Sequence, residues 1–298
     1  MKKAIVTGAN GFLGSNLVKR LVSDRWEVHT ITRRHISADI EGLGVKNHLV
    51  KHNQYACISE IVASVNPEVI YHLAAFVITE HKTEDILPLL DSNIIFGTYL
   101  LEGLKECKIK KFVNAGTFWQ HYDNKAYSAV NLYAASKQAF QALIDFYVES
   151  YSIKTITLRL FDNYGPGDLR NKLFTQLLKA SNTGNHIDMT KGDQYVNLVY
   201  VDDVIESLLA AYNLISTPRF NGHKHYKVCS SEEIKLKELV ELYQKLLGKR
   251  ININWGAKPY RNREIFMTPS FGEPLPGWSS KVSLEEGIKL LLLSNQDE

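Results

Sequence analysis

The 298-residue chain has few cysteines, little net charge and no long hydrophobic run. Its three cysteines include no CxxC pair, which is typical of reduced residues in a cytoplasmic protein and excludes a disulfide scaffold. The formal net charge of +3 is too small to indicate binding to nucleic acid or to a membrane surface. No stretch approaches the ~18 apolar residues of a transmembrane helix, and the amino-terminal apolar segment is too short for a signal peptide. We therefore expect a cytoplasmic protein with neither nucleic acid nor membrane as a partner.

Strand-like and helix-like segments alternate through the first half of the chain. Apolar runs and helical spacing predict strands at 4–6, 27–32, 69–73, 111–114 and 155–161, and helices at 12–23, 58–65, 93–106 and 132–151. Such alternation predicts an α/β fold with a doubly wound parallel sheet. After Gly165-Pro166-Gly167 the pattern breaks down and five of the eight prolines follow. We expect residues 1–165 to form one domain, with 196–215 packed back onto it, and 166–298 to form a smaller α/β region.

Three glycines, Gly8, Gly11 and Gly14, lie directly after the first predicted strand and open the first predicted helix. In this context glycines allow a tight turn, the close approach of a diphosphate and close packing of helix on strand. The helix amino terminus then offers free N–H groups to phosphate. We interpret 1–165 as a Rossmann-type nucleotide-binding domain, in which Asn10, Phe12 and Leu13 also contact the cofactor. The alternative is a tight turn without a ligand.

The end of the second predicted strand indicates which cofactor binds. Sites for NAD usually place a carboxylate there, whereas this chain has Arg33 and Arg34 and no carboxylate before Asp39. Guanidinium groups suit the 2′-phosphate that distinguishes NADPH. The pattern favours NADPH, and the alternative is a solvated basic turn.

A tyrosine and a lysine four residues apart, Tyr133 and Lys137, share one face of the predicted helix 132–151. A fixed ammonium beside a phenol favours the phenolate, so we expect Lys137 to lower the pKa of Tyr133 toward working pH. A pair with this spacing is common by chance, so its weight depends on the motifs around it.

These motifs occur in the order found in the extended short-chain dehydrogenases/reductases that act on nucleotide sugars, and the chain resembles that family over nearly its whole length. Beside the glycine loop and the Tyr-Lys pair, the resemblance is carried by His72-Leu73-Ala74-Ala75, Asn93-Ile94-Ile95-Phe96-Gly97-Thr98, Gly116-Thr117, Leu158 to Gly167, and Tyr200-Val201-Asp202-Asp203-Val204. Within the family, the segments around Thr117 and Tyr133 are similar to nucleotide-sugar 4-ketoreductases of deoxysugar and O-antigen biosynthesis.

The resemblance implies roles for further residues. Thr117 would hold the substrate oxygen, and Lys137 would also hold the nicotinamide ribose. Further cofactor contacts would come from Asn53, Leu73, Ala74, Ala75 and Asn93. The substrate would contact Phe118, Trp119, Asp162 and Asn163, with its diphosphate on Arg170 and Arg261. The family's arginine before the Asp-Phe-Val-Tyr-Val motif is replaced by Val196, so phosphate binding must be arranged differently.

The residues after Thr117 narrow the reaction. Family dehydratases carry Asp-Glu there, whereas this chain has Phe118-Trp119-Gln120. We expect NADPH-dependent reduction of the C4 keto group of a nucleoside-diphosphate 4-keto-deoxyhexose, with Thr117, Tyr133 and Lys137 catalytic. A 4-epimerase of the same family is the alternative, and a non-catalytic NADP-sensing regulator is a remote one. We expect no metal, because His72, His81 and His121 lack ligand spacing. The resemblance also implies a homodimer formed through a four-helix bundle.

Overall fold

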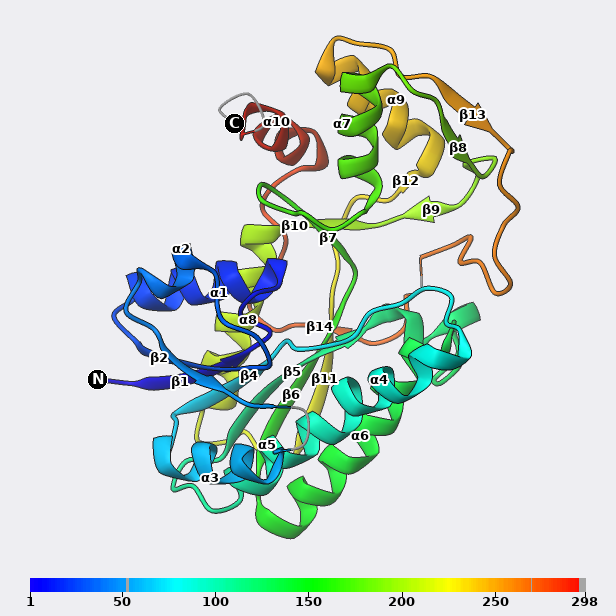
Figure 1. The fold of residues 1–298 in the computed structure, drawn as a ribbon. Helices are drawn as coiled ribbons and strands as arrows, with labels where there is room; N and C mark the ends of the chain where they lie inside the picture. Colours follow the sequence, from blue (N-terminus) through cyan, green and yellow to red (C-terminus); the bar gives the residue numbers. More distant parts are fainter. Residues whose placement is uncertain (52–53, 269, 295–298) are drawn as a thin grey trace.

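An eight-stranded sheet forms the centre of the computed structural model, which describes residues 1–51, 54–268 and 270–294 (Figure 1). Every neighbouring pair in this sheet is parallel. The order across the sheet is β14 (Glu273–Pro274), β11 (His223–Val228), β6 (Lys154–Leu160), β5 (Lys111–Thr117), β4 (Val69–His72), β1 (Lys3–Thr7), β2 (Glu27–Thr32) and β3 (Lys46–Leu49). The doubly wound parallel sheet predicted from the sequence is confirmed.

Helices cover both faces of the sheet because successive residues of its buried strands point to opposite sides. In β1, Ala4 and Val6 join the core beneath α1 (Phe12–Ser23) and α8 (Val201–Ile215). Ile5 joins the core on the other face. The helices there are α3 (Ala56–Val65), α5 (Phe96–Leu104) and α6 (Leu132–Tyr151), with α4 (Ile86–Leu90) beside α6. A short α2 (Ala38–Glu41) between β2 and β3 packs beside α1, and its Ile40 joins the core on the α1 face.

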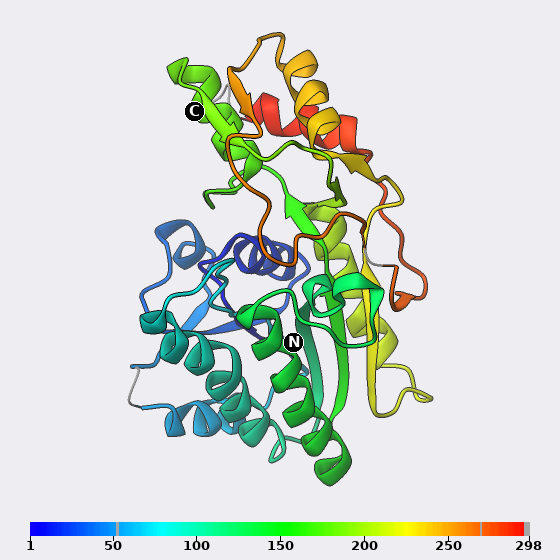
Figure 2. The same ribbon diagram turned by 90° about the vertical axis from the view of Figure 1, so that its right-hand side faces the viewer.

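A smaller group of elements lies beyond the carboxyl ends of the central strands (Figure 2). Its helices are α7 (Leu173–Thr183), α9 (Leu236–Leu247) and α10 (Leu284–Ser294). Three strand pairs accompany them: β7 (Asp162–Tyr164) with β10 (Leu198–Tyr200), β8 (Ile187–Met189) with β13 (Ile253–Trp255), and β9 (Tyr195–Val196) with β12 (Ile234–Lys235). The division into 1–165 and 166–298 stays a prediction.

Two strands of the large sheet, β11 and β14, come from the part of the chain after residue 166. Neither strand is predicted from the sequence. The β11 segment reads His-Lys-His-Tyr-Lys-Val, in which only Tyr226 and Val228 are apolar and buried. Its pattern therefore lacks the apolar run that marks the other central strands.

The helix expected at 93–106 is part of a longer helical segment. It begins at α4, passes through a π-helical turn at Asp91–Ile95 and continues as α5. Shorter 3₁₀ turns lie at Thr83–Asp85, Phe118–Gln120 and Tyr122–Asn124. Among the described residues, no helix combines the length and the apolar character that crossing a bilayer requires.

Candidate active site

The glycine loop joins β1 to α1 where the sheet, the helix and the β4 end meet. Gly8 has φ +75°, and a Cβ there would stand 2.8 Å from the backbone nitrogen of Ala74. A Cβ at Gly14 would stand 2.0 Å from the carbonyl oxygen of Gly8. Both positions therefore require glycine. No described side chain caps α1, whose N-cap residue is Gly11, so its positive dipole end is available to a phosphate.

The segment after β2 is tied to this loop through Asn10. The Asn10 side chain donates to the carbonyl of His35 at 2.9 Å and accepts from the backbone N–H of Ser37 at 3.2 Å. Between these contacts and β2 lie the predicted phosphate ligands: Arg33, whose guanidinium is 3.8 Å from the Asp91 carboxylate, and Arg34, which is exposed. Asn10 therefore holds the segment after β2 against the glycine loop. The predicted contact Asn53 lies outside the described residues.

The segment after β4 is fixed by Thr7 and Asn93. The Thr7 hydroxyl accepts from the backbone N–H of Ala74 at 3.2 Å. The fully buried Asn93 amide bonds both backbone groups of Phe76, at 2.8 and 3.1 Å, and donates to the Ser136 hydroxyl at 3.0 Å. Asn93 thus clasps this segment to α6, while Leu73, Ala74 and Ala75 are half-buried beside it.

Tyr133 and Lys137 lie in the first turns of α6, which begins at an Asn131 cap that accepts from the Ala134 N–H at 2.9 Å. Both side chains are buried. The Tyr133 phenol hydrogen-bonds to the Thr117 side chain. The structure thus places Thr117 beside Tyr133, and it buries the Lys137 side chain one turn further along α6.

Burial controls the protonation of this group. It raises the pKa of Tyr133 to about 12, with a further contribution from the Asp162 carboxylate, whereas the Thr117 hydrogen bond opposes the rise. Burial also lowers the pKa of Lys137 to about 8. The direction for Tyr133 is the reverse of the one expected from the sequence, and Lys137 is not among the groups that shift it. The phenol is therefore protonated at neutral pH, which is the form a proton donor needs.

The residues after Thr117 form a 3₁₀ turn that separates two aromatic side chains. The Thr117 hydroxyl accepts from the Trp119 N–H at 3.3 Å, while the Gln120 amide oxygen accepts from the Thr117 N–H at 3.1 Å. Phe118 stacks on Phe161 with ring centroids 4.5 Å apart. Trp119 instead meets Tyr133 edge-on at 6.2 Å. Phe118 thus packs against the core, and Trp119 faces the site.

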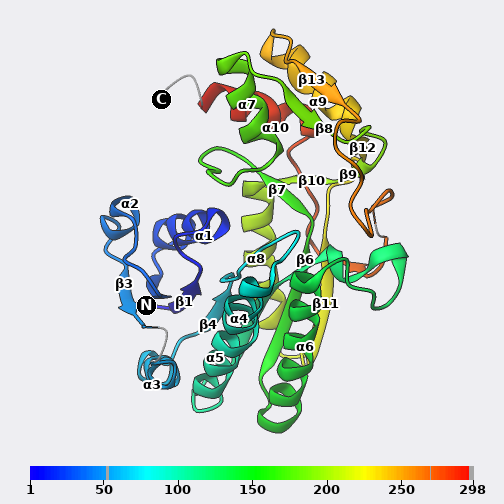
Figure 3. The same ribbon diagram turned by 45° about the vertical axis from the view of Figure 1, so that its right-hand side comes forward.

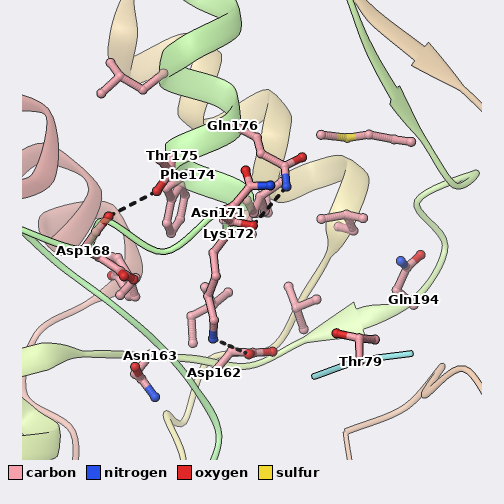
Figure 4. Close-up of a pocket in the computed structure, with 18 of the residues that line it drawn as sticks. Thr79, Asp162, Asn163, Asp168, Asn171, Lys172, Phe174, Thr175, Gln176 and Gln194 are labelled. Carbon is pink, nitrogen blue, oxygen red and sulfur yellow. Dashed lines mark hydrogen bonds and ion pairs between the residues drawn. The ribbon is translucent and has the colours of Figure 1, made fainter. Parts of the chain in front are cut away.

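A cavity of about 940 Å³ adjoins the catalytic group through Trp119. Figure 4 shows part of its lining. Its wall includes Thr79, Trp119, Asp162, Asn163, Lys172 and Val196. Tyr133 and Thr117 do not line the cavity. Two residues of its wall connect it to Tyr133: Trp119 contacts the Tyr133 ring, and the Asp162 carboxylate raises the pKa of the phenol. Within the cavity the Lys172 ammonium is 3.2 Å from the Asp162 carboxylate.

The two arginines predicted to bind a diphosphate are both engaged by carboxylates. Arg261 lines the cavity above the Trp119 ring, and its guanidinium contacts the two Glu264 oxygens at 3.1 and 2.9 Å. Arg170 is absent from the wall, because its guanidinium binds Asp168 at 2.6 Å and covers the Phe12 ring. Lys258 is a further cation on the wall that is not predicted from the sequence. Its position three residues before Arg261 is the one feature of the sequence from which a role in the site could have been predicted.

Comparison with known proteins identifies the family of this chain. Residues 4–229 match the model of the NAD dependent epimerase/dehydratase family. The chain belongs to that family. The part of the chain that matches the family model contains the glycine loop, Thr117, Tyr133 and Lys137, whereas Arg261 lies outside it.

Similar family members include two proteins called CDP-abequose synthase. The one from Salmonella muenchen is 31% identical over 98% of this chain and 97% of its own length. The one from Yersinia pseudotuberculosis is 27% identical, with 90% and 92% covered. Among solved structures, the Thermotoga maritima UDP-glucose 4-epimerase with UDP-glucose has a TM-score of 0.86 at 20% identity, with 99% of each chain covered. At this identity the structural match supports the fold alone.

Proposed function

We propose that this enzyme uses NADPH to reduce the C4 keto group of a nucleoside-diphosphate 4-keto-deoxyhexose. Its membership of the NAD dependent epimerase/dehydratase family and its similarity to CDP-abequose synthases support a reaction on nucleotide sugars in deoxysugar biosynthesis. The observation that carries the choice of reduction is the β2 end, where two guanidinium groups replace the usual carboxylate. The nearby Asp39 is engaged by Lys19 at 3.2 Å.

The residues of the site fit a dinucleotide cofactor and divide the work between them. The glycine loop and the amino terminus of α1, which no described side chain caps, would hold the diphosphate, and Lys137 would hold the nicotinamide ribose. NADPH bound there would supply the hydride. Tyr133 donates its proton to the C4 oxygen, and Thr117 orients that oxygen.

Epimerisation is the second candidate, because the matched solved structures include UDP-glucose 4-epimerases and the same three side chains would serve it. Dehydration is disfavoured, because Phe118, Trp119 and Gln120 supply no acid to act beside Thr117. The decisive experiment supplies NADPH with CDP-, dTDP- or UDP-linked 4-keto-6-deoxyglucose. Stoichiometric loss of NADPH with formation of the alcohol supports reduction. Interconversion of the two 4-hydroxy epimers of a nucleotide sugar without added cofactor would instead show that the reaction is epimerisation.

The cofactor preference gives a direct prediction. NADPH should bind ten- to a hundred-fold more tightly than NADH, because a charge-assisted contact to the 2′-phosphate contributes about 1.5–3 kcal/mol. In a fluorescence titration, Arg34→Ala should weaken NADPH and leave NADH unchanged. The exposed Arg219→Ala, in the turn after α8, is the matched control. Equal or tighter binding of NADH by the unmodified protein would contradict the assignment.

We also propose a homodimer formed by α5 and α6. Phe146 on α6 is 54% exposed and contacts the rings of Tyr147 and Tyr151, so a partner helix would bury an aromatic cluster. Light scattering tests this. A mass of one chain that does not change with concentration would refute the dimer.

A further inference from the structure

One buried surface between α6 and the sheet is polar. In β6, Ile156, Leu158 and Leu160 join the core beneath α8, whereas Thr155, Thr157 and Arg159 alternate with them and are buried on the opposite side. On the neighbouring β11, His223 pairs with Thr155 and His225 with Thr157 in the strand register. Figure 3 shows α6 beside this edge of the sheet. Buried polar side chains in such a place need partners.

The partners form a chain that ends at the surface. Asn114 donates to the Thr157 hydroxyl at 3.1 Å, and this hydroxyl is 2.8 Å from Nε2 of His223. Nδ1 of His223 is 2.6 Å from a carboxylate oxygen of Asp145 on α6, whose side chain is 52% exposed. The His225 ring lies 4.0 Å from the His223 ring, and its buried Nδ1 has no hydrogen-bond partner within the described part of the chain.

We propose that Asp145, His223 and His225 bind a divalent transition-metal ion of the zinc type. One potential ligand atom from each residue lies within 4.8 Å of the others. The ligand atoms of a tetrahedral zinc ion stand about 3.3 Å apart, given bond lengths of about 2.0–2.1 Å, so small side-chain rotations suffice. Two imidazoles and one carboxylate form an established zinc ligand set that leaves a position for water.

The surroundings supply what a metal site needs beyond its ligands. The Thr157 hydroxyl can both donate and accept a hydrogen bond. Without metal it donates to Nε2 of His223, and once Nδ1 coordinates the ion it accepts from the Nε2–H group. Burial lowers the pKa of His225 to about 3, which keeps its imidazole neutral. The exposed Asp145 carboxylate provides the entry path. The nearby Arg159 guanidinium repels a metal cation, so we expect its charge to weaken the affinity of the site.

Bound metal would join the carboxyl-terminal half of α6 to β11, a strand contributed by the second half of the chain. The site is separate from the catalytic group, which lies in the first turns of α6. It was not predicted from the sequence, where only His72, His81 and His121 were considered. His223 and His225 alternate on one strand, and their third ligand is 78 residues away.

The test uses the full chain without a histidine tag, freed of metal by chelator dialysis and titrated with Zn²⁺ in a calorimeter. We expect one saturable site per chain and a melting temperature raised by about 5 °C when zinc is a hundred-fold above Kd. Asp145→Asn and His225→Gln should each weaken binding at least ten-fold. Asp188→Asn, which alters the exposed His186–Asp188 pair, is the matched control and should bind as the unmodified protein does.

Cobalt and magnesium sharpen the outcome. Co²⁺ should bind with the visible absorption of a tetrahedral site and be displaced by Zn²⁺, whereas Mg²⁺, which prefers oxygen ligands, should not compete. Circular dichroism of each variant shows whether it is folded, and Asp145→Asn changes only a half-exposed helical side chain. Absence of saturable zinc binding, or binding that both variants retain in full, would overturn the proposal.

Discussion

Replacing Tyr133 by phenylalanine should lower turnover by about 10²–10⁴-fold, the usual contribution of a positioned proton donor. The substitution keeps the ring and its edge contact with Trp119 and removes only the hydroxyl that bonds Thr117. The affinities for NADPH and for the sugar nucleotide should therefore change little. Steady-state kinetics with the 4-keto sugar measures the loss, and fluorescence titration checks that the cofactor still binds.

Tyr127→Phe is the matched control, because this phenol lies exposed in the loop before α6. It should retain full turnover. Thr117→Val should fall between Tyr133→Phe and the unmodified protein, since the donor remains while the orientation of the oxygen is lost. Near-normal reduction by Tyr133→Phe with NADPH bound would eliminate this mechanism.

Replacing Lys137 by methionine should harm catalysis while it stabilises the fold. The buried ammonium contacts no carboxylate among the residues described, and burial lowers its pKa from 10.5 to about 8. The unfolded chain binds this proton more tightly, so the charge costs stability below pH 8, and the cost disappears as pH rises from 8 toward 10.5. From that shift, removing the charge should stabilise the protein by about 3 kcal/mol at pH 7.

The same substitution should reduce both turnover and NADPH affinity at least ten-fold, because in the proposed mechanism the ammonium holds the nicotinamide ribose of the cofactor. Thermal denaturation and cofactor titration of one preparation give both readings. Lys179→Met, an exposed lysine on α7, controls for the loss of a charge. A less stable Lys137→Met protein, or one that binds NADPH normally, would contradict this account.

The sequence predicts the first half of the fold well because that half is built from apolar runs. Helices 12–23 and 132–151 have the predicted bounds, since their apolar residues recur at helical spacing. β11 is not predicted because four of its six residues are histidine or lysine, which leaves no apolar run. Its place in the sheet depends on pairing with β6, a long-range contact that local patterns do not report.

The candidate site shows the same division. Glycines at fixed spacing predict the loop, because only glycine fits at Gly8 and Gly14. Ion pairing is less visible in a sequence: Arg170 and Arg261 are predicted to bind the diphosphate, but no local pattern shows that Asp168 and Glu264 contact them. The direction of the Tyr133 pKa shift is also predicted wrongly from the sequence. Helical spacing shows that a lysine is near, but it does not show how deeply both groups are buried.

The Lys172–Asp162 pair connects the two ends of the site. Asp162 faces the ammonium within the cavity and also raises the pKa of Tyr133. An anionic ligand that draws Lys172 to itself leaves the Asp162 charge less balanced, so the phenol then holds its proton more tightly. By reciprocity, the phenolate formed after proton donation weakens the hold on that anion. Release of a charged product would thus be favoured by the step that creates it.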